Sequence, residues 1–194
     1  RVYALAHHIV HYTQGSLERE AIERFLHAYQ SVTPLAMGEI WALPLMLRLA
    51  SIENTLRAIA RVTDLEAPPI EDAPGDYLAQ ELSDDLIVGN SIHSLRVLDT
   101  VDWETFFDNV SRVEQILRRD PGNIYARMDF ETRNQYRRVI EDIARAAGTD
   151  EERVAHIAVN LARDAATDEW RQSRNARAVD IGGDGDGHII DLRR

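Results

Sequence analysis

The sequence predicts an all-α protein, a multi-helix bundle of about six to seven helices in two parts joined by an acidic, proline-rich linker. Apolar residues recur at spacings of three and four along most of the chain, which is the period of an amphipathic helix. Capping residues, glycine and proline divide these segments at regular points. No convincing run alternates with the period of two that a strand requires. Apolar residues make up 44% of the 194 residues, enough for a buried core.

Two helices are expected before residue 33. The first ends at Gly15, and Ser16 is expected to cap the second. The residues expected to face inward in the first helix are Val2, Leu5, Ala6, Ile9 and Tyr12. Those expected to face inward in the second are Leu17, Ala21, Phe25, Ala28 and Val32.

A third helix is expected from Pro34 to about Arg61, with Thr33 as its cap and a proline at its first position. This segment is apolar nearly all round, which is typical of a helix in the middle of a bundle. Pro44 is expected to kink or break it. Four polar residues interrupt it: Glu39, Arg48, Glu53 and Asn54. Of these, Glu39 and Arg48 are expected to lie at the ends of the buried stretch or to pair with other helices.

The second half is expected to hold four more helices. The first covers Asn90 to Leu98, the second is capped by Asp102 and ends at 120–123, and the third runs from Asp129 to Gly148. The fourth begins at a capping box formed by Thr149 and Glu152. The residues expected to face inward are Phe106, Val110, Val113 and Leu117, then Tyr136, Val139, Ile140 and Ile143, then Val154, Ile157, Ala158, Leu161 and Ala165.

Charge and composition suggest four regions. Residues 63–90 hold eight acidic side chains and no basic one, and they include Pro68, Pro69 and Pro74. Proline and acidic residues together neither continue a helix nor bury much surface, so a mobile linker is expected. The expected division is an N-terminal helical region (residues 1–62), an acidic linker (63–89), a C-terminal helical region (90–167) and a flexible Gly/Asp tail (168–194).

Composition excludes several classes of chemistry. The chain has no cysteine, which rules out disulfides, thiolate nucleophiles and cysteine-based metal sites. All 22 basic residues are arginine, so a catalytic lysine is excluded. A net charge of −11 argues against nucleic acid as a partner. The longest uncharged apolar stretch, Ile40–Leu47, is far short of the roughly 20 residues that span a bilayer. Because the chain starts at Arg1, it is interpreted as a processed or excised piece.

Two patterns have the appearance of metal sites, but neither is assigned one. His7 and His11 lie four residues apart beside His8, a spacing that can place two imidazoles on one ion, although a third ligand is not identifiable. In the tail, Asp184 and Asp186 fit a calcium loop whose first and twelfth positions would be Gly182 and Arg193, which are not acidic ligands. The sequence therefore assigns no catalytic, cofactor-binding or metal-binding residue.

Arginines and aromatic residues receive structural interpretations. The arginines cluster around Arg118–Arg119, Arg127, Arg133 and Arg137–Arg138 and could bind an anion, but nearby acidic residues favour ion pairs on helix faces. Trp41, Trp103, Phe106 and Phe107 are interpreted as core anchors.

Two stretches of the chain carry specific strings of mixed polar and aromatic residues. The first comprises Ala28–Leu35, Gly38–Ala50 and Ile52–Asn54. The second comprises Ser91–Ile92, Ser94–Arg96, Asp102–Trp103, Val113–Gln115, Leu117–Arg118, Asp120–Pro121, Tyr125, Met128–Phe130, Thr132–Arg133 and Tyr136–Arg137. Together these strings resemble the N-terminal helical region of cyclic β-1,2-glucan synthases. They occur in the order of that family and cover about half of the chain, and the resemblance ends after about Ala166.

The resemblance implies a role without catalysis for this segment. Such synthases are large inner-membrane proteins of Gram-negative bacteria that make a cyclic β-1,2-glucan from UDP-glucose, with transferase motifs and membrane helices outside the region matched here. The segment would be a helical accessory region at the cytoplasmic face, with the catalytic and membrane domains of the same polypeptide as partners. It would carry no cofactor, while UDP-glucose and a divalent metal would bind elsewhere in the full-length protein.

Two alternatives remain from the residues alone. One is an independent helical interaction module, with self-association through the apolar helix 34–61. The other is a small metalloenzyme built on His7, His8 and His11.

Overall fold

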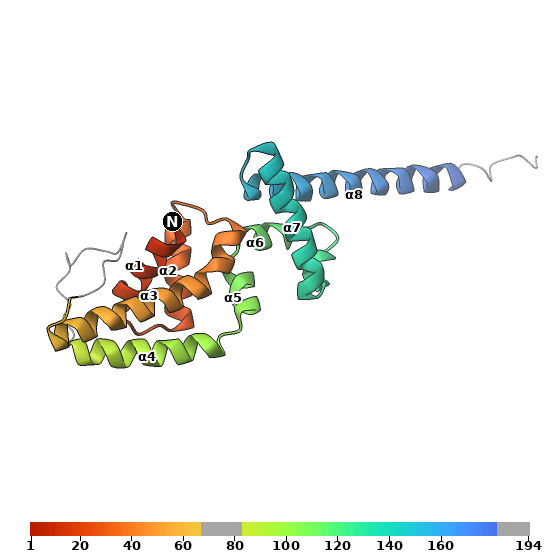
Figure 1. The fold of residues 1–194 in the computed structure, drawn as a ribbon. Helices are drawn as coiled ribbons and strands as arrows, with labels where there is room; N and C mark the ends of the chain where they lie inside the picture. The colour runs from red at the N-terminus through yellow and green to blue at the C-terminus, as the bar shows by residue number, and fades with distance from the viewer. Residues whose placement is uncertain (67–82, 182–194) are drawn as a thin grey trace, which may run out of the picture. The chain divides into compact units, whose positions relative to one another are not determined.

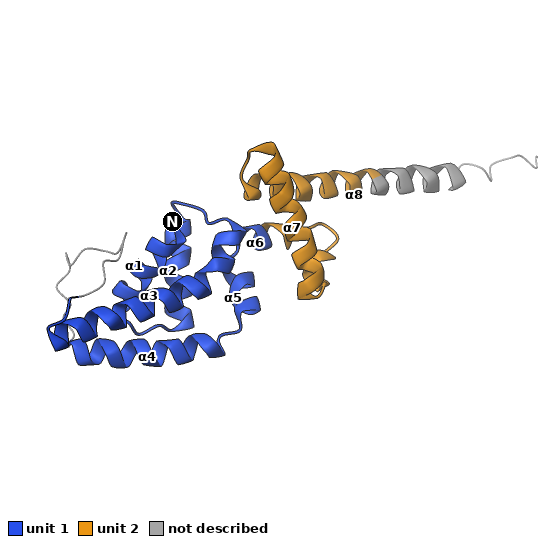
Figure 2. Cartoon of the chain, viewed as in Figure 1, with its two compact units in different colours: residues 1–115 blue, residues 116–194 orange. Residues whose placement is uncertain are grey.

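The computed structural model describes residues 1–66 and 83–181, with side chains described as far as Asp168. The described residues form eight α-helices and one 3-10 helix, with no strand among them, which confirms the all-α prediction (Figure 1). They divide into two compact units, Arg1–Gln115 and Ile116–Arg194 (Figure 2). No helix in the described part of the chain is both long and apolar enough to cross a membrane.

Unit 1 is built around α3 (Met37–Thr63), which packs against α1 (Val2–Tyr12) and α4 (Asp84–Thr100). Helix α2 (Arg19–Gln30) packs against α5 (Trp103–Val110), and α5 also contacts α3. The short α6 (Arg112–Leu117) follows α5. The core of unit 1 is lined by Leu5, Ile9, Leu17, Ile22, Leu26, Ile40, Leu43, Leu47, Ile87, Leu98, Phe106 and Phe107.

The turn between α1 and α2 is fastened to α4 by polar contacts. Gly15 has φ +78°, and its carbonyl oxygen accepts a 2.6 Å hydrogen bond from the Ser94 hydroxyl. The Leu17 amide donates to the same hydroxyl oxygen at 2.7 Å, and Asn90 donates to the Gln14 carbonyl at 3.1 Å. Because these contacts hold residues 15–17 outside a helix, Ser16 does not cap α2, which begins after Glu18.

The inward face predicted for the second helix is correct only in part, since Leu17 is buried and Ala21 and Phe25 are half-buried. The buried residues of α2 are Ile22, Leu26 and Gln30, whereas Ala28 and Val32 are exposed. The prediction took its phase from Leu17, which lies in the turn before α2. In α1 the predicted core residues Leu5, Ala6 and Ile9 are buried, but Tyr12 at the helix end is exposed.

Helix α3 differs from its prediction at its start and in its burial. It begins at Met37, where the Glu39 carboxylate accepts from the Ala36 amide at 2.9 Å, so Thr33 is not the cap. It continues through Pro44 without a break. It is also not enclosed on all sides, because only one side packs against its neighbours while large apolar residues on the other remain exposed.

The predicted start at Asp102 is confirmed, but the helix that follows is interrupted. The Asp102 carboxylate accepts from the amides of Glu104 and Thr105 at 3.1 and 3.2 Å. The chain leaves helical geometry at Ser111, where φ is −71° and ψ 118°, so that α5 and α6 are separate helices. The four residues predicted to face inward are all buried: Phe106, Val110, Val113 and Leu117.

Unit 2 contains the 3-10 helix η1 (Tyr125–Arg127) and the packed pair α7 (Phe130–Ala147) and α8 (Glu151–Ile181). Asp129 caps α7 through a 2.8 Å hydrogen bond from the Thr132 amide, and Gly148 ends it with φ +63°, so both predicted boundaries are confirmed. Asp150 caps α8 by accepting from the Arg153 amide at 2.7 Å, in place of the predicted Thr149.

The inward residues predicted for unit 2 are correct only in some positions. Ile140 and Val154 are buried, as predicted, and Ala158 is half-buried. The others predicted to face inward are exposed: Tyr136, Val139, Ile143, Ile157, Leu161 and Ala165. Two helices bury only the stripe between them, so the wide apolar faces of α7 and α8 leave residues outside the contact.

The unit boundary falls at a different place from the expected division at the linker. Helices α3 and α4, which flank the linker, lie in the same unit. Residues 67–82 and 182–194 lie outside the described residues, and with them most of the expected linker and the Gly/Asp end of the tail. Helix α8 continues to Ile181 because residues 168–181 contain neither glycine nor proline and Gly182 is the first such residue.

Replacing Gly15 with alanine is expected to destabilise unit 1 by about 1–2 kcal/mol, because a left-handed conformation penalises a Cβ. The added Cβ would also lie only 3.0 Å from the Ser91 hydroxyl. Gly38 is the matched control, since a Cβ there meets nothing within 4 Å and the residue lies inside α3. Gly38→Ala should leave stability unchanged or raise it by up to about 1 kcal/mol. Urea unfolding of both variants measures the difference, and equal effects would contradict the role given to the turn.

Candidate functional site

A cluster of three polar side chains joins α1 to α3. His7 Nε2 lies 2.7 Å from a carboxylate oxygen of Glu53, and the Tyr3 hydroxyl donates to both Glu53 oxygens at 3.0 and 3.2 Å. The Tyr3 and His7 rings meet edge to face with centroids 4.7 Å apart. The His7 side chain is only 5% exposed and that of Glu53 20%. The cluster therefore presents little surface to a substrate and acts first as a contact between helices.

The pKa of His7 is lower than that of an ordinary histidine. Burial lowers it most, and the charges of Arg57 and His8 lower it further, while the Glu53 carboxylate acts in the opposite direction. Burial prevails, so the neutral imidazole is favoured in the folded protein over a wider pH range than in the unfolded chain.

The other polar residues of α3 also contact neighbouring segments, as predicted. Arg1 forms an ion pair with Glu39 and donates from Nε at 2.7 Å. Arg48 donates to the Leu98 carbonyl at 3.1 Å and to the Asp99 carboxylate at 3.0 Å, at the end of α4. These contacts, together with that of Glu53, are made on both flanks of α3.

Asn54 is the fourth of these polar residues of α3, and it contacts α4. Its amide nitrogen donates to the Ser91 hydroxyl at 3.4 Å, beside the buried Ser51. Ser51 and Ser91 are both fully buried. Glu39, Arg48, Glu53 and Asn54 thus fix how α3 is turned toward its neighbours.

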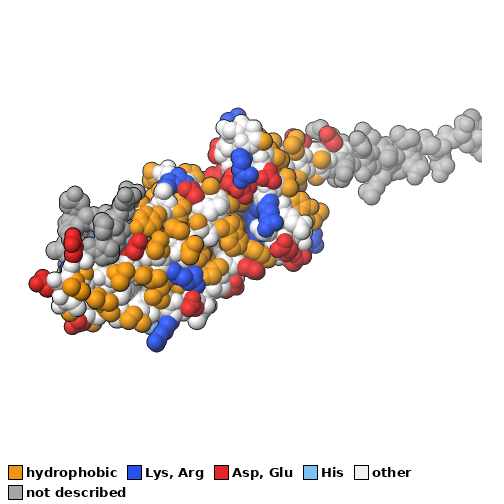
Figure 3. All heavy atoms as spheres, in the orientation of Figure 1, with side chains coloured by type: hydrophobic (Ala, Val, Ile, Leu, Met, Phe, Trp, Pro, Cys, Tyr) orange, Lys and Arg blue, Asp and Glu red, His pale blue; other side chains and the backbone are white. Residues whose placement is uncertain are grey.

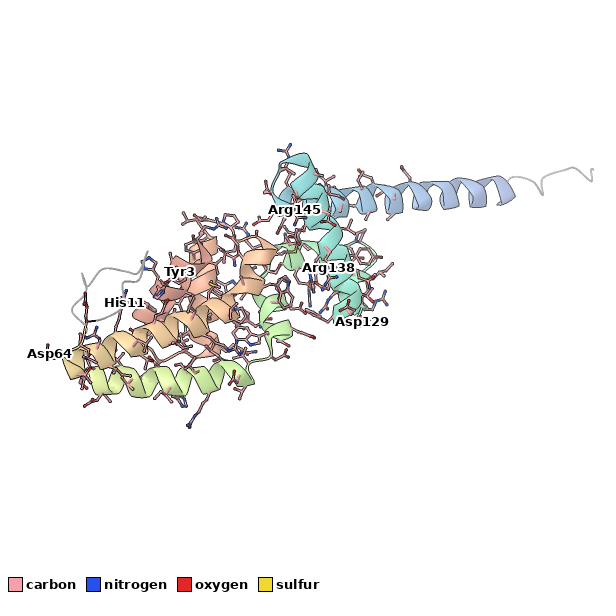
Figure 4. All side chains as sticks on the ribbon, in the orientation of Figure 1. Tyr3, His11, Asp64, Asp129, Arg138 and Arg145 are labelled. Atoms are coloured by element: carbon pink, nitrogen blue, oxygen red, sulfur yellow. The ribbon has the colours of Figure 1, made fainter. Side chains whose placement is uncertain are left out.

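The structure places the three histidines of α1 in different surroundings. His7 is buried against Glu53, His8 is exposed and His11 is half-buried farther along α1, where Figure 4 labels it with Tyr3. Across residues 1–66 and 83–168, no group of three or more His, Asp or Glu side chains is placed to hold a metal ion. The calcium-loop pattern around Asp184 and Asp186 lies outside the described residues.

The arginines of unit 2 fall into two groups. Arg133 and Arg137 are buried, and the Arg137 guanidinium carbon lies 4.6 Å from the centre of the Phe130 ring, within the range of a cation–π contact. Arg118, Arg119 and Arg138 are exposed; Figure 4 labels Arg138 on α7 between Asp129 and Arg145. Arg127 donates to the carbonyl of Asn123 at 2.7 Å. The predicted cluster is therefore not one basic surface.

Three of the four predicted aromatic anchors lie in the interior or contact it closely. Phe106 and Phe107 are buried, and Trp103 packs edge to face on Phe106 and donates to the Leu98 carbonyl at 3.2 Å. Trp41 stacks on Phe107 with centroids 4.5 Å apart, but its outer surface remains exposed.

The outer side of α3 carries a continuous apolar surface, which we call the α3 face. Every residue of α3 that is exposed between positions 41 and 59 is large and apolar. Its members, between 38% and 64% exposed, are Trp41, Leu45, Leu49, Ile52, Leu56 and Ile59. Figure 3 shows hydrophobic side chains gathered over the region of α3 and α4.

The exposed α3 face departs from the leading prediction of an enclosed helix, although self-association through the apolar helix 34–61 was among the alternatives. A helix that is apolar all round is either enclosed within its own domain or contacts something outside it. Enclosure was expected, and the exposure of six residues corrects that expectation. A heptad count along residues 41–59 would have separated this stripe from the buried one.

Comparison with known proteins shows that the chain is distantly related to the cyclic β-1,2-glucan synthases. The cyclic β-(1,2)-glucan synthase NdvB of Rhizobium meliloti (strain 1021) is 28% identical over 232 residues, covering 85% of this chain. The chain spans 8% of the length of that protein. The matched span is longer than the 194 residues of this chain, so the relative carries residues inside the span that this chain lacks. No family model matches the chain. No solved structure matches it either.

Removing the Glu53 carboxylate is expected to destabilise unit 1. Glu53→Ala deprives the Tyr3 hydroxyl and His7 of their shared partner in a poorly hydrated place, which costs about 1–3 kcal/mol. Tyr3→Phe should destabilise the native chain but should cost much less in the Glu53→Ala background, because the contact is already lost. A double-mutant cycle from urea unfolding measures this coupling, and additive effects would contradict it.

The free energy of unfolding should also fall as the pH is lowered through the range in which His7 titrates. Because the folded-state pKa of His7 lies below its unfolded value near 6.5, the unfolded chain binds the proton more readily. The contribution of His7 is fully present above about pH 6.5 and is lost as the pH falls through the folded-state pKa.

Thermal unfolding at pH 7.5, 6.5 and 5.5 measures this loss. The His7→Gln variant provides the control, since it cannot titrate in this range and its melting temperature should change less between those pH values. Equal slopes for the two proteins would contradict the assignment to His7.

Proposed function

We propose that this chain is a helical, non-catalytic accessory segment of a cyclic β-1,2-glucan synthase-like polypeptide. The observation that carries the proposal is the match of 85% of the chain to a span that makes up 8% of the Rhizobium meliloti synthase. In such a polypeptide, other regions would bind UDP-glucose and a divalent metal and would transfer glucose. This segment would pack against those catalytic and membrane domains at the cytoplasmic face of the bacterial inner membrane.

The contacts of α3 support a structural role. Glu39, Arg48 and Glu53 each pair with a group on another segment of unit 1. A carboxylate that acts as a general base must reach a substrate proton within hydrogen-bonding distance. The Glu53 oxygens are instead occupied by Tyr3 and His7, so their interactions hold α1 on α3.

The α3 face favours a second candidate, an independent helical module that binds a protein. Six exposed apolar side chains on one helix form a larger apolar patch than isolated surface residues make. In this second candidate the chain again has a structural role, but it acts without the other regions of a synthase polypeptide.

Incubating the purified chain with radiolabelled UDP-glucose and Mg²⁺ or Mn²⁺ should yield no glucan and no hydrolysis above a blank. Full-length Rhizobium meliloti synthase in membranes is the positive control for the assay. Glucan made by the isolated chain would overturn the non-catalytic assignment.

Deleting the matched span from the Rhizobium meliloti synthase tests the accessory role. Glucan synthesis should fall at least tenfold while the truncated protein is still found in the membrane by immunoblot. Replacing the span with this chain should restore some of the activity, and replacing it with an unrelated helical bundle of similar size should not. Undiminished synthesis after deletion would overturn the proposal.

A further inference from the structure

The α3 face has the spacing of a coiled-coil seam. From Leu45 the exposed apolar positions follow at intervals of four, three, four and three, ending at Ile59. Such a repeat presents one straight stripe of side chains to a partner helix, with knobs that fit between the side chains of that helix. The spacing therefore selects an α-helix as the element that covers the face.

We infer that the α3 face pairs with the same face of a second copy of the chain, with the two α3 helices antiparallel about Ile52. This inference does not depend on the proposed function, since it uses only the residues of unit 1. The commonest assemblies of identical chains are two-fold dimers, in which one patch meets itself and must be complementary to itself.

The stripe meets that requirement. Leu45 and Ile59 lie seven residues before and after Ile52, and Leu49 and Leu56 lie three before and four after it. A two-fold axis at Ile52 therefore places Leu45 opposite Ile59 and Leu49 near Leu56, leucine or isoleucine throughout. No small or polar residue interrupts the exposed row.

The area is also of the required order. Six large side chains with 38–64% exposure leave on the order of 500 Å² of apolar surface on one helix. A stable interface buries roughly 800 Å² on each partner, some of it a polar rim.

Two of the charges beside the stripe already have partners within unit 1. A two-fold axis brings every charge near a like charge, which is unfavourable when that charge lacks a counterion. Arg48, which flanks Leu49 and Ile52, is neutralised by Asp99 at 3.0 Å. Glu53 is turned to the other flank, against His7 and Tyr3.

A lipid surface fits the face less well. Helices that lie in the membrane interface are rich in lysine and arginine on their polar side. Residues 37–63 carry three arginines and two glutamates, and the chain as a whole carries a net charge of −11. We therefore assign the face to a second copy.

Sedimentation equilibrium of the 194-residue chain is the first test. The native chain should show a concentration-dependent dimer, and Leu45→Glu should raise its dissociation constant at least tenfold. Leu161→Glu is the matched control, because Leu161 is also a leucine with 64% exposure but lies on α8. It should leave the dimer unchanged. Circular dichroism and melting curves verify that both variants fold.

Cross-linking tests the antiparallel arrangement. The chain has no cysteine, so Ile52→Cys and Leu45→Cys each introduce a single thiol. Residue 52 meets its own copy at the axis and should form a disulfide-linked dimer under mild oxidation. The two copies of residue 45 are separated along the helix axis by roughly 21 Å at 1.5 Å per residue, too far for a disulfide.

Four results would overturn the inference. The first is a native chain that stays monomeric at all concentrations, and the second is a dimer that Leu45→Glu leaves intact. The third is cross-linking of residue 45 as readily as residue 52, which indicates a parallel pair. Flotation of the monomer with anionic phosphatidylglycerol vesicles, abolished by Leu45→Glu, would assign the face to lipid and would also overturn the inference.

Discussion

The orientation of α3 about its own axis is the constraint on which unit 1 depends. The helix is apolar on nearly every side, so burial of apolar area does not by itself select which side faces the core. The selection comes from polar groups that tolerate few positions. Glu53 must reach Tyr3 and His7 on α1, while Asn54 must reach Ser91 and Arg48 must reach Asp99 on the other flank. One rotation of α3 satisfies all three contacts, and it leaves the stripe from Trp41 to Ile59 outside.

Helix ends that depend only on nearby residues were predictable from the sequence. Asp102, Asp129 and Gly148 were placed correctly because a cap depends on groups within three or four residues of it. Ser16 and Thr33 have the same chemistry but do not cap. A distant hydroxyl fixes the turn at Ser16, whereas α3 begins only at Met37, where Glu39 accepts from the Ala36 amide. The hydroxyl of Ser94, far along the chain, holds residues 15–17 in a turn.

Buried helix faces and pairs of distant side chains were less predictable, because they too depend on residues far apart in the chain. Glu53 and His7 were each singled out from the sequence, but nothing in it indicated that they would meet across 46 residues. The periodicity of α7 identified an amphipathic helix, yet the buried positions include Arg133 and Arg137, which no hydrophobic count assigns to the interior. A guanidinium packed against the Phe130 ring contributes apolar contact as well as charge.

The fold of unit 1 does not explain why the exposed residues of the α3 face are apolar. The exposed part of these six side chains contributes nothing to the buried side of α3 or to its polar contacts, although Trp41 also stacks on the buried Phe107. Leaving on the order of 500 Å² of apolar surface in water forgoes roughly 12 kcal/mol of gross burial free energy at 25 cal/mol per Å², before the cost of association is subtracted. An arrangement that fixes the rotation of α3 with three separate polar contacts, and so holds this stripe outward, is better understood as the presentation of a surface than as an incomplete core. The contact that covers the α3 face therefore lies outside unit 1, and the identity of its partner decides how this segment acts.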